Sequence, residues 1–159
     1  MTWRGTTTVK DRIFASLPYL LPLLDVQLFG MFLFRQFPIL KWIYDVPLKP
    51  LLALYYGFPL GSLIIFFVLY FAVVRNERIN HLIRFNAMQA ILIGIILTLI
   101  SLVFRILAVV LTSSLLVETL FNIIFLGTLV ASIYSIIQSL VGRYAELPGI
   151  SEASYFQVR

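Results

Sequence analysis

The polar side chains that could do chemistry gather in one short segment, residues 75–89, of an otherwise apolar chain. They are Arg75, Asn76, Glu77, Arg78, Asn80, His81, Arg84, Asn86 and Gln89. His81 is the only histidine and the chain has no cysteine, which excludes a multi-histidine metal site, thiolate ligands, disulfides and a cysteine nucleophile. No carboxylate pair, serine triad or phosphate-binding loop accompanies them. The sequence therefore predicts a protein that is not an enzyme, with no catalytic residue, metal or cofactor.

The arginines of this segment are typical of a basic loop that meets anionic lipid headgroups. Asn86 and Gln89 differ, because they fall where an apolar run has already begun. Polar amides at such a place usually bond to neighbouring helices. We therefore expect contacts between helices or with a partner from Arg75, Asn76, His81, Arg84, Asn86 and Gln89.

Asp25 is a carboxyl group inside the first apolar run, where an unpaired charge is costly. Pro18 and Pro22 precede it at helical spacing and interrupt the run. One interpretation is a discontinuous helix that lines a polar path, with Asp25 facing that path. The alternative is that the span ends near Leu24 and leaves Asp25 in an interfacial turn.

Arg105 lies late in the third apolar run, at the end of a stripe of small and polar residues. It can extend its side chain to the distant headgroups, or it can pair with Asp25 or Glu118. Small residues also recur at helical spacing in other runs, and they favour close helix packing. The packing candidates are Gly57, Gly61, Gly94, Ser101, Ser132 and Ser135. A hydrated pathway would use similar residues, so the pattern leaves both roles open.

Composition indicates what surrounds these residues. Of 159 residues, 61% are hydrophobic and 12% charged, and the mean hydropathy is +1.01. A soluble domain of this length could not bury so much apolar surface. A spanning helix needs about 20 apolar residues. The sequence predicts an all-α, polytopic membrane protein whose four spans cover about 13–34, 58–74, 86–108 and 119–141.

The connections define the predicted domains. Residues 1–12 form a polar N-terminus, residues 13–146 the transmembrane domain, and residues 147–159 a polar, loose tail. Between the first two spans, residues 35–57 mix charges with apolar residues and contain three prolines. We expect short amphipathic pieces in the membrane interface there, not one regular helix.

Charge distribution predicts orientation. The net charge is +5, and its basic residues flank apolar runs, so membrane lipids and not nucleic acid are the expected partners. With four spans, eight Lys and Arg fall on the side of both termini and four on the other. The excess predicts that both termini are cytoplasmic or stromal.

Several motifs carry a family resemblance. His81-Leu82-Ile83-Arg84-Phe85-Asn86 is the central one, and residues 11–15, 17–25, 73–76 and 87–90 agree with it. Together they resemble the signature of the twenty-kilodalton subunit family of the translocon at the inner envelope membrane of chloroplasts. The resemblance covers about residues 11–141. The family's His-Phe-Ile-Arg-Phe-Asn stands here with leucine in place of the first phenylalanine.

The resemblance implies four membrane helices, with both termini stromal or cytoplasmic. It also implies a channel-forming or channel-associated role in moving preproteins, in the plastid inner envelope or a cyanobacterial membrane. The implied partners are other translocon subunits, further copies of the chain and the translocating polypeptide. No long extension precedes the first span, so a cyanobacterial or plastid-encoded member is expected.

Two other functions remain open from the residues alone. One is a non-conducting scaffold or assembly factor, which needs the packing residues and not Asp25. The other is a small-solute carrier or ion channel, for which only Asp25 and Arg105 are candidate site residues. Four short helices are too few for a wide pore in one chain, so a polypeptide path requires partner chains.

Overall fold

A computed structural model describes residues 7–108 and 114–158 as an all-helical bundle, and this described part contains no strand. The predicted fold class is confirmed. Three helical stretches are long and apolar enough to cross a membrane: Val9–Gln36, His81–Leu107 and Ser114–Val141. A fourth crossing is made if Pro38–Tyr56 and Gly61–Val74, bent by 95°, count as one broken span. The chain is therefore an integral membrane protein with three or four spans.

The first span changes helix type four times along its length. Its pieces are α1 (Val9–Ser16), the 3-10 turn η1 (Leu17–Tyr19), α2 (Leu20–Asp25), the 3-10 turn η2 (Val26–Gly30) and α3 (Met31–Gln36). Thr8 and Asp11 form a capping box that begins α1. Pro18 lies in η1 and starts a new turn, because it has no N–H to continue the old one. The chain stays helical beyond Asp25, so the interpretation that the span ends near Leu24 is wrong.

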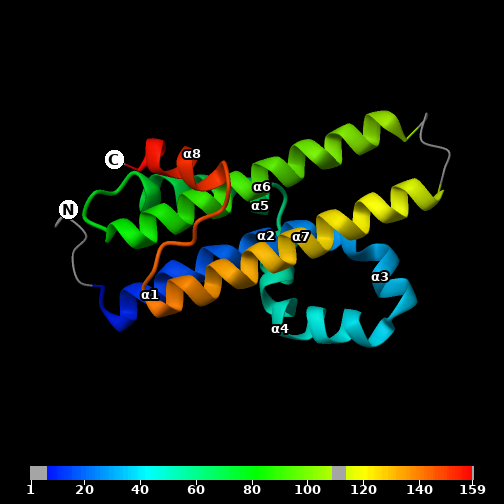
Figure 1. Ribbon diagram of the computed structural model, residues 1–159, viewed down its shortest axis with the longest axis horizontal. Coiled ribbons are helices and arrows are strands. Elements are labelled where there is room, and N and C mark those ends of the chain that lie inside the picture. Colours follow the sequence, from blue (N-terminus) through cyan, green and yellow to red (C-terminus); the bar gives the residue numbers. More distant parts are fainter. Residues whose placement is uncertain (1–6, 109–113, 159) are drawn as a thin grey trace.

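The bent pair would be the second crossing along the chain. It consists of α4 (Pro38–Tyr56) and α5 (Gly61–Val68), which continues as the π-helix η3 (Leu69–Val74). Figure 1 shows α4 running back along the outside of the bundle from α3, with α5 beginning near the middle of the molecule. The predicted span 58–74 corresponds to the second half of this pair alone, α5 with η3.

The expectation of short pieces in residues 35–57 is also wrong, because α4 is a single helix that contains Pro47 and Pro50. Each proline removes one hydrogen bond, to the carbonyl four residues earlier. Those carbonyls belong to Ile43 and Val46, whose side chains are exposed on the outside of α4. Headgroups or water can satisfy groups on that side, so the helix continues.

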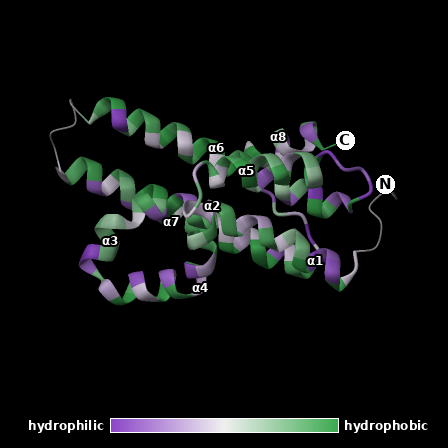
Figure 2. Cartoon of the chain, turned by 180° about the vertical axis from the view of Figure 1, so that it is seen from behind, coloured by the Kyte–Doolittle hydropathy of each residue, from purple (hydrophilic) through white to green (hydrophobic). Residues whose placement is uncertain are grey.

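The two remaining long apolar helices are α6 (His81–Leu107) and α7 (Ser114–Val141). On α7 the side chains of Ser132, Ser135 and Ser139 are fully buried, whereas Val130 and Ile133 are 66% and 46% exposed. Small polar groups inside and bulky apolar groups outside suit a lipid environment. Figure 2 shows the hydrophobic colouring along both helices.

Predictions for residues 1–6, 109–113 and 159, including Arg4, lie outside the described residues.

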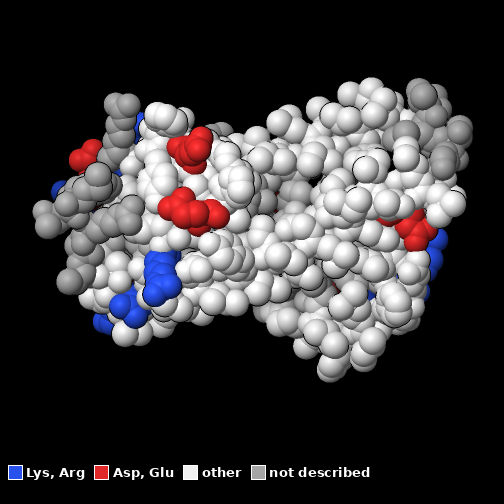
Figure 3. Space-filling model, in the orientation of Figure 1, with Lys and Arg blue, Asp and Glu red and all other residues white. Residues whose placement is uncertain are grey.

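The C-terminal segment is not a loose tail. It forms α8 (Ile150–Gln157), which packs against α6 and buries Ser151, Ser154 and Val158. Figure 1 shows α1 and α8 at the same end of the molecule, with α3 at the other. On the face in Figure 3 the charged side chains lie toward these two ends, and the middle is uncharged.

The interior toward the α3 end is filled by aromatic rings. Phe29 lies 5.0 Å from Phe121, and Phe34 lies 5.3 Å from Phe125, between ring centroids and close to edge-on. Tyr44 of α4 packs on Phe125 at 5.5 Å. Such pairs add specific stabilisation to their area burial. The centre of the bundle is thus packed at this end.

Candidate functional site

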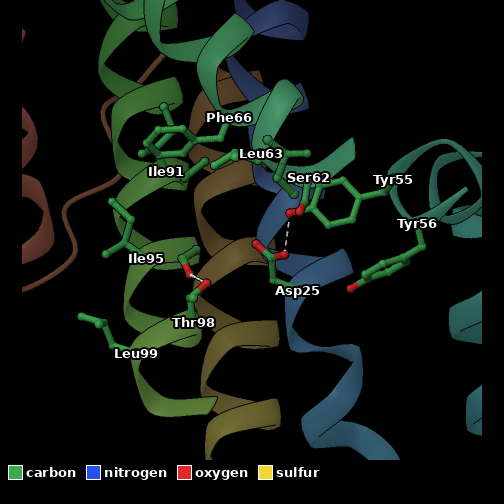
Figure 4. A pocket seen from close by; sticks show the side chains of 13 residues that line it. Asp25, Tyr55, Tyr56, Ser62, Leu63, Phe66, Ile91, Ile95, Thr98 and Leu99 are labelled. Carbon is green, nitrogen blue, oxygen red and sulfur yellow. Dashed lines mark hydrogen bonds between the residues drawn. The ribbon is translucent and has the colours of Figure 1, made fainter. Parts of the chain in front are cut away.

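Asp25 lies at the end of α2, near the middle of the span Val9–Gln36, beside the break between α4 and α5. The hydroxyl of Tyr55 donates a 2.6 Å hydrogen bond to its carboxyl oxygen Oδ1. Figure 4 shows this bond, with Ser62 of α5 and Thr98 of α6 beside the same space. A polar group at membrane depth is stabilised here by a donor from another element.

Two cavities meet at Asp25. The first has a volume of about 420 Å³ and lies between α2, α5 and α6, with mostly apolar walls. The second has a volume of about 880 Å³ and extends toward the α3 end. Both are lined by Asp25, Tyr56, Ser62 and Thr98. These four residues supply the polar groups where the cavities join.

Gly94 has a more specific role than general packing. A Cβ atom at this position would lie 3.0 Å from Oδ2 of Asp25. The missing side chain therefore gives the carboxyl group room beside α6. Ser101, another of the predicted packing residues, lines the second cavity, and its hydroxyl donates to the Thr98 carbonyl at 2.8 Å.

Gly57 directly follows α4 and Gly61 begins α5, so the two glycines do not lie on one continuous helix. A Cβ at Gly61 would come within 2.7 Å of the Tyr55 carbonyl oxygen, and one at Gly57 within 2.1 Å of the Ala53 carbonyl oxygen. The backbone turns further at Leu60, whose φ of 62° is left-handed. The two glycines thus allow backbone atoms to approach each other closely within a sharp turn. They do not bring two separate helices together.

The polar segment 75–89 separates into two parts. Arg75 is exposed, and Asn76 accepts a 3.1 Å hydrogen bond from the Arg78 amide, so both belong to the loop. Arg84 is buried, and its Nε donates to the Val74 carbonyl at 2.9 Å, which ties α6 to the end of η3. Arg84 therefore makes a contact between α6 and η3.

Asn86 and Gln89 are fully buried on α6, which packs against both η1 and α8. The Tyr19 hydroxyl lies 2.6 Å from Asn86 Oδ1 and 2.9 Å from Gln89 Oε1 and donates its one proton between them. Gln89 Nε2 donates to the Ala145 carbonyl at 3.2 Å and to Ser151 Oγ at 3.1 Å. This set of contacts, the polar junction, holds the C-terminal segment against the bundle.

His81 supports the same segment from the start of α6. Its Nδ1 lies 2.9 Å from the Tyr144 hydroxyl and its Nε2 lies 3.0 Å from the Val158 carbonyl. The ring of Phe85 on α6 packs against the ring of Tyr155 on α8, with centroids 4.5 Å apart. The polar residues of the sequence motif therefore serve mainly to join helices.

Arg105 lines the second cavity, and its side chain is exposed. Among the described residues it forms no ion pair with Asp25 or Glu118, so the ion-pair alternative is not observed. Glu118 instead accepts a 2.5 Å hydrogen bond from Gln36. Within residues 7–108 and 114–158, no three histidine, aspartate or glutamate side chains gather as a metal site would require.

Sequence reasoning missed Tyr19, Tyr55 and Ser151. Tyr55 belongs to the segment 35–57, for which we expected short pieces in the membrane interface, and its hydroxyl bonds to Asp25. Tyr19 directly follows Pro18, and a hydroxyl next to a helix break was the one available signal. Ser151 lies in the segment that we expected to be loose.

Comparisons with known proteins agree with the sequence motifs. Residues 8–154 match the family described as chloroplast import apparatus, Tic20-like. A Tic20 family protein of Synechocystis sp. is 52% identical over 160 residues, which cover 100% of this chain and 99% of the relative. The Tic20 family protein Ycf60 of Gracilaria tenuistipitata var. liui is 38% identical, over 95% of this chain and 76% of the relative. The chloroplastic protein TIC 20-II of Arabidopsis thaliana is 30% identical, over 93% and 72%. The chain thus belongs to the Tic20-like family, whose members occur in cyanobacteria and plastids.

Proposed function

We propose that this chain is a subunit of a protein-translocation complex and forms, with partner chains, one side of a polar path for a polypeptide. The family description names an import apparatus and no enzyme. The observation that carries the proposal is Asp25, a carboxyl group near mid-span that faces cavities on the outside of the bundle. A buried structural carboxyl group would be enclosed by its own chain.

The path is proposed to lie beside the chain and not through it. The rings of Phe29, Phe34 and Phe125 occupy the interior toward the α3 end. The two cavities that meet at Asp25 lie between α2, α5 and α6 and extend toward the α3 end, and they are open to the outside of the bundle. A partner subunit or a second copy would close that side, and irregular backbone near membrane depth is tolerated where it lines such a cavity.

We further propose that both termini face the stroma or cytoplasm of a plastid inner envelope or cyanobacterial membrane. The excess of Lys and Arg at the end of the molecule that carries α1 and α8 supports this orientation. The chain has no cysteine, so a single one can be introduced by Glu152→Cys on α8. Its labelling by an impermeant thiol reagent in sealed vesicles tests the orientation. Labelling only after the cytoplasmic or stromal face is opened would support the orientation.

A crosslinking experiment tests the path. A photoreactive amino acid is placed at Thr98, which lines both cavities, and in a matched variant at Ile133, which is exposed on α7. Each variant is assembled in its native type of membrane with a precursor whose ligand-locked folded domain arrests it during translocation. We expect the arrested precursor to crosslink to Thr98 and lipid to crosslink to Ile133.

The same assay separates the proposal from a non-conducting scaffold. Asp25→Leu should weaken the Thr98 crosslink if the carboxyl group lines the path. If the arrested precursor crosslinks to neither Thr98 nor Ile133, and the Asp25→Leu variant still assembles into complexes, the path is refuted. That result would favour the non-conducting scaffold. Ion flux through liposomes that contain the purified chain alone would instead favour a small-solute or ion channel.

A further inference from the structure

The second cavity is lined by three basic side chains that come from separate parts of the chain. Arg35 lies in the last turn of α3, Lys41 in the first half of α4 and Arg105 near the end of α6. Helix packing brings them to one cavity of about 880 Å³, a volume in the range that encloses a small-molecule ligand. Like charges gathered in this way repel each other unless an anion joins them.

These cations lie at the level of one membrane surface. Arg105 follows His81 by 24 residues, which in an α-helix corresponds to a distance of about 36 Å. The hydrocarbon core is about 30 Å thick, so this end of α6 reaches the headgroup region opposite α1 and α8. Arg35 ends the first span at the same end of the molecule.

The charges of the cavity do not balance. Lys41 forms an ion pair with Asp45, which also accepts a 2.9 Å hydrogen bond from Gln27. In the described part of the chain, Arg35 and Arg105 form no ion pair with a carboxylate. The one carboxyl group that lines the cavity, Asp25, is bonded to Tyr55. Arg35 and Arg105 therefore line the second cavity with no carboxylate paired to them in the described part of the chain.

The remaining walls of the cavity are apolar. Leu28, Met31 and Leu97 line it, together with the rings of Phe29 and Phe34. Leu28 and Met31 are exposed, at 51% and 41%. A free inorganic anion would use only the basic end and none of this apolar wall. An amphipathic ligand would use both.

We propose that this cavity binds one anionic lipid of the membrane leaflet opposite α1 and α8. The phosphate or sulfonate of its headgroup lies between Arg35 and Arg105, and an acyl chain lies along Leu28, Met31 and Leu97. Arginine suits this contact, because its planar fork donates two parallel hydrogen bonds to such an oxyanion. The second cavity also belongs to the proposed path, but lipid binding by the purified protein is measured without any translocating polypeptide, so the two proposals can fail separately.

Lipid retention by the purified full-length protein tests the site. The protein is exchanged into nanodiscs or detergent with defined phosphatidylglycerol and phosphatidylcholine, and bound lipid is counted by native mass spectrometry. We expect the wild type to retain one phosphatidylglycerol in preference to phosphatidylcholine. Arg35→Gln with Arg105→Gln should lower that affinity about tenfold for each arginine removed, since hydrogen bonds to charged groups are of this strength.

The matched control is Arg78→Gln with Arg143→Gln, two exposed arginines outside the cavity that give the same change of net charge. Their retention should equal that of the wild type. Equal loss in both double variants, or no loss in the cavity variant, overturns the proposal. If the cavity variant is not monodisperse, Arg35→Lys with Arg105→Lys replaces it, and this charge-preserving pair should still lose several-fold in affinity because it lacks the fork.

Two further arms identify the source of the anion. Inorganic phosphate and the soluble headgroup glycerophosphoglycerol are added at concentrations that match the lipid. We expect neither to displace the retained lipid. Displacement by either compound would mean a free-anion site, and equal retention of phosphatidylcholine would mean an unselective apolar groove; both results refute the proposal.

Discussion

Replacing Gln89 by leucine should release α8 from the bundle while leaving the transmembrane helices in place. Leucine has a similar size, so the change removes hydrogen bonds and leaves no large cavity. The two bonds donated by Gln89 Nε2, to the Ala145 carbonyl and to Ser151 Oγ, hold the connection between α7 and α8. Their loss should lower the free energy of local opening of α8.

The magnitude follows from what each partner keeps. The Ala145 carbonyl still accepts from Ser151 Oγ at 3.1 Å, and the Tyr19 hydroxyl still donates to Asn86. No partner is left without a bond, so the cost is that of the lost bonds alone, at about 1 kcal/mol each. Two bonds correspond to about 2 kcal/mol, or about a 30-fold decrease in the protection of α8 amides.

Hydrogen exchange of peptides that cover Ile150–Gln157, followed by mass spectrometry in detergent, measures this protection. Gln138→Leu on α7 is the matched control, because its side chain makes no hydrogen bond to a described residue. Unchanged exchange in Gln89→Leu, or an equal increase in Gln138→Leu, would refute the reasoning that the polar junction holds α8.

Three other substitutions test the surroundings of Asp25, each through thermal unfolding in mild detergent. Tyr55→Phe removes the hydroxyl that donates to Asp25 and should destabilise the protein by about 1–3 kcal/mol, since a half-buried carboxyl group loses its donor; an unchanged unfolding temperature would argue against that bond. Gly94→Ala places a methyl group 3.0 Å from Asp25 Oδ2 and should destabilise by about 1 kcal/mol, whereas Gly127→Ala, which meets nothing within 4 Å, should be neutral or stabilising. Gly61→Ala forces a backbone shift at the Tyr55 carbonyl and should cost about 1–3 kcal/mol; a cost no greater than that of Gly127→Ala would contradict the sharp turn.

Helices were predictable from the sequence where their own residues repeat at helical spacing and so mark the buried and exposed faces. The small residues of α7 recur at helical spacing, and the structure buries Ser132 and Ser135 as that spacing predicts. The apolar length of α6 predicted a span, and its amides at Asn86 and Gln89 predicted contacts between helices. In these cases the period of a single helix contains the information.

Features that depend on distant residues were not predictable. Tyr55 bonds to a carboxyl group 30 residues away, and Tyr19 bonds to Gln89 across 70. The order in α8 likewise arises from α6, because an eight-residue helix has little stability by itself. The helix α4 continues through Pro47 and Pro50 where the residues four positions earlier, Ile43 and Val46, are exposed, and only the folded arrangement determines that exposure.

The break between α4 and α5 bears on the order in which the protein is built. Helix α4 carries three charged residues, Lys41, Asp45 and Lys49, and α5 with η3 has only 14 residues, about 21 Å of helix. Neither half matches the length and apolarity by which a nascent chain partitions into a bilayer. Both gain their burial from neighbours, through Tyr55 on Asp25 and η3 on α6. We therefore expect this crossing to settle after α6 has entered the bilayer, so that biogenesis does not follow the order of translation.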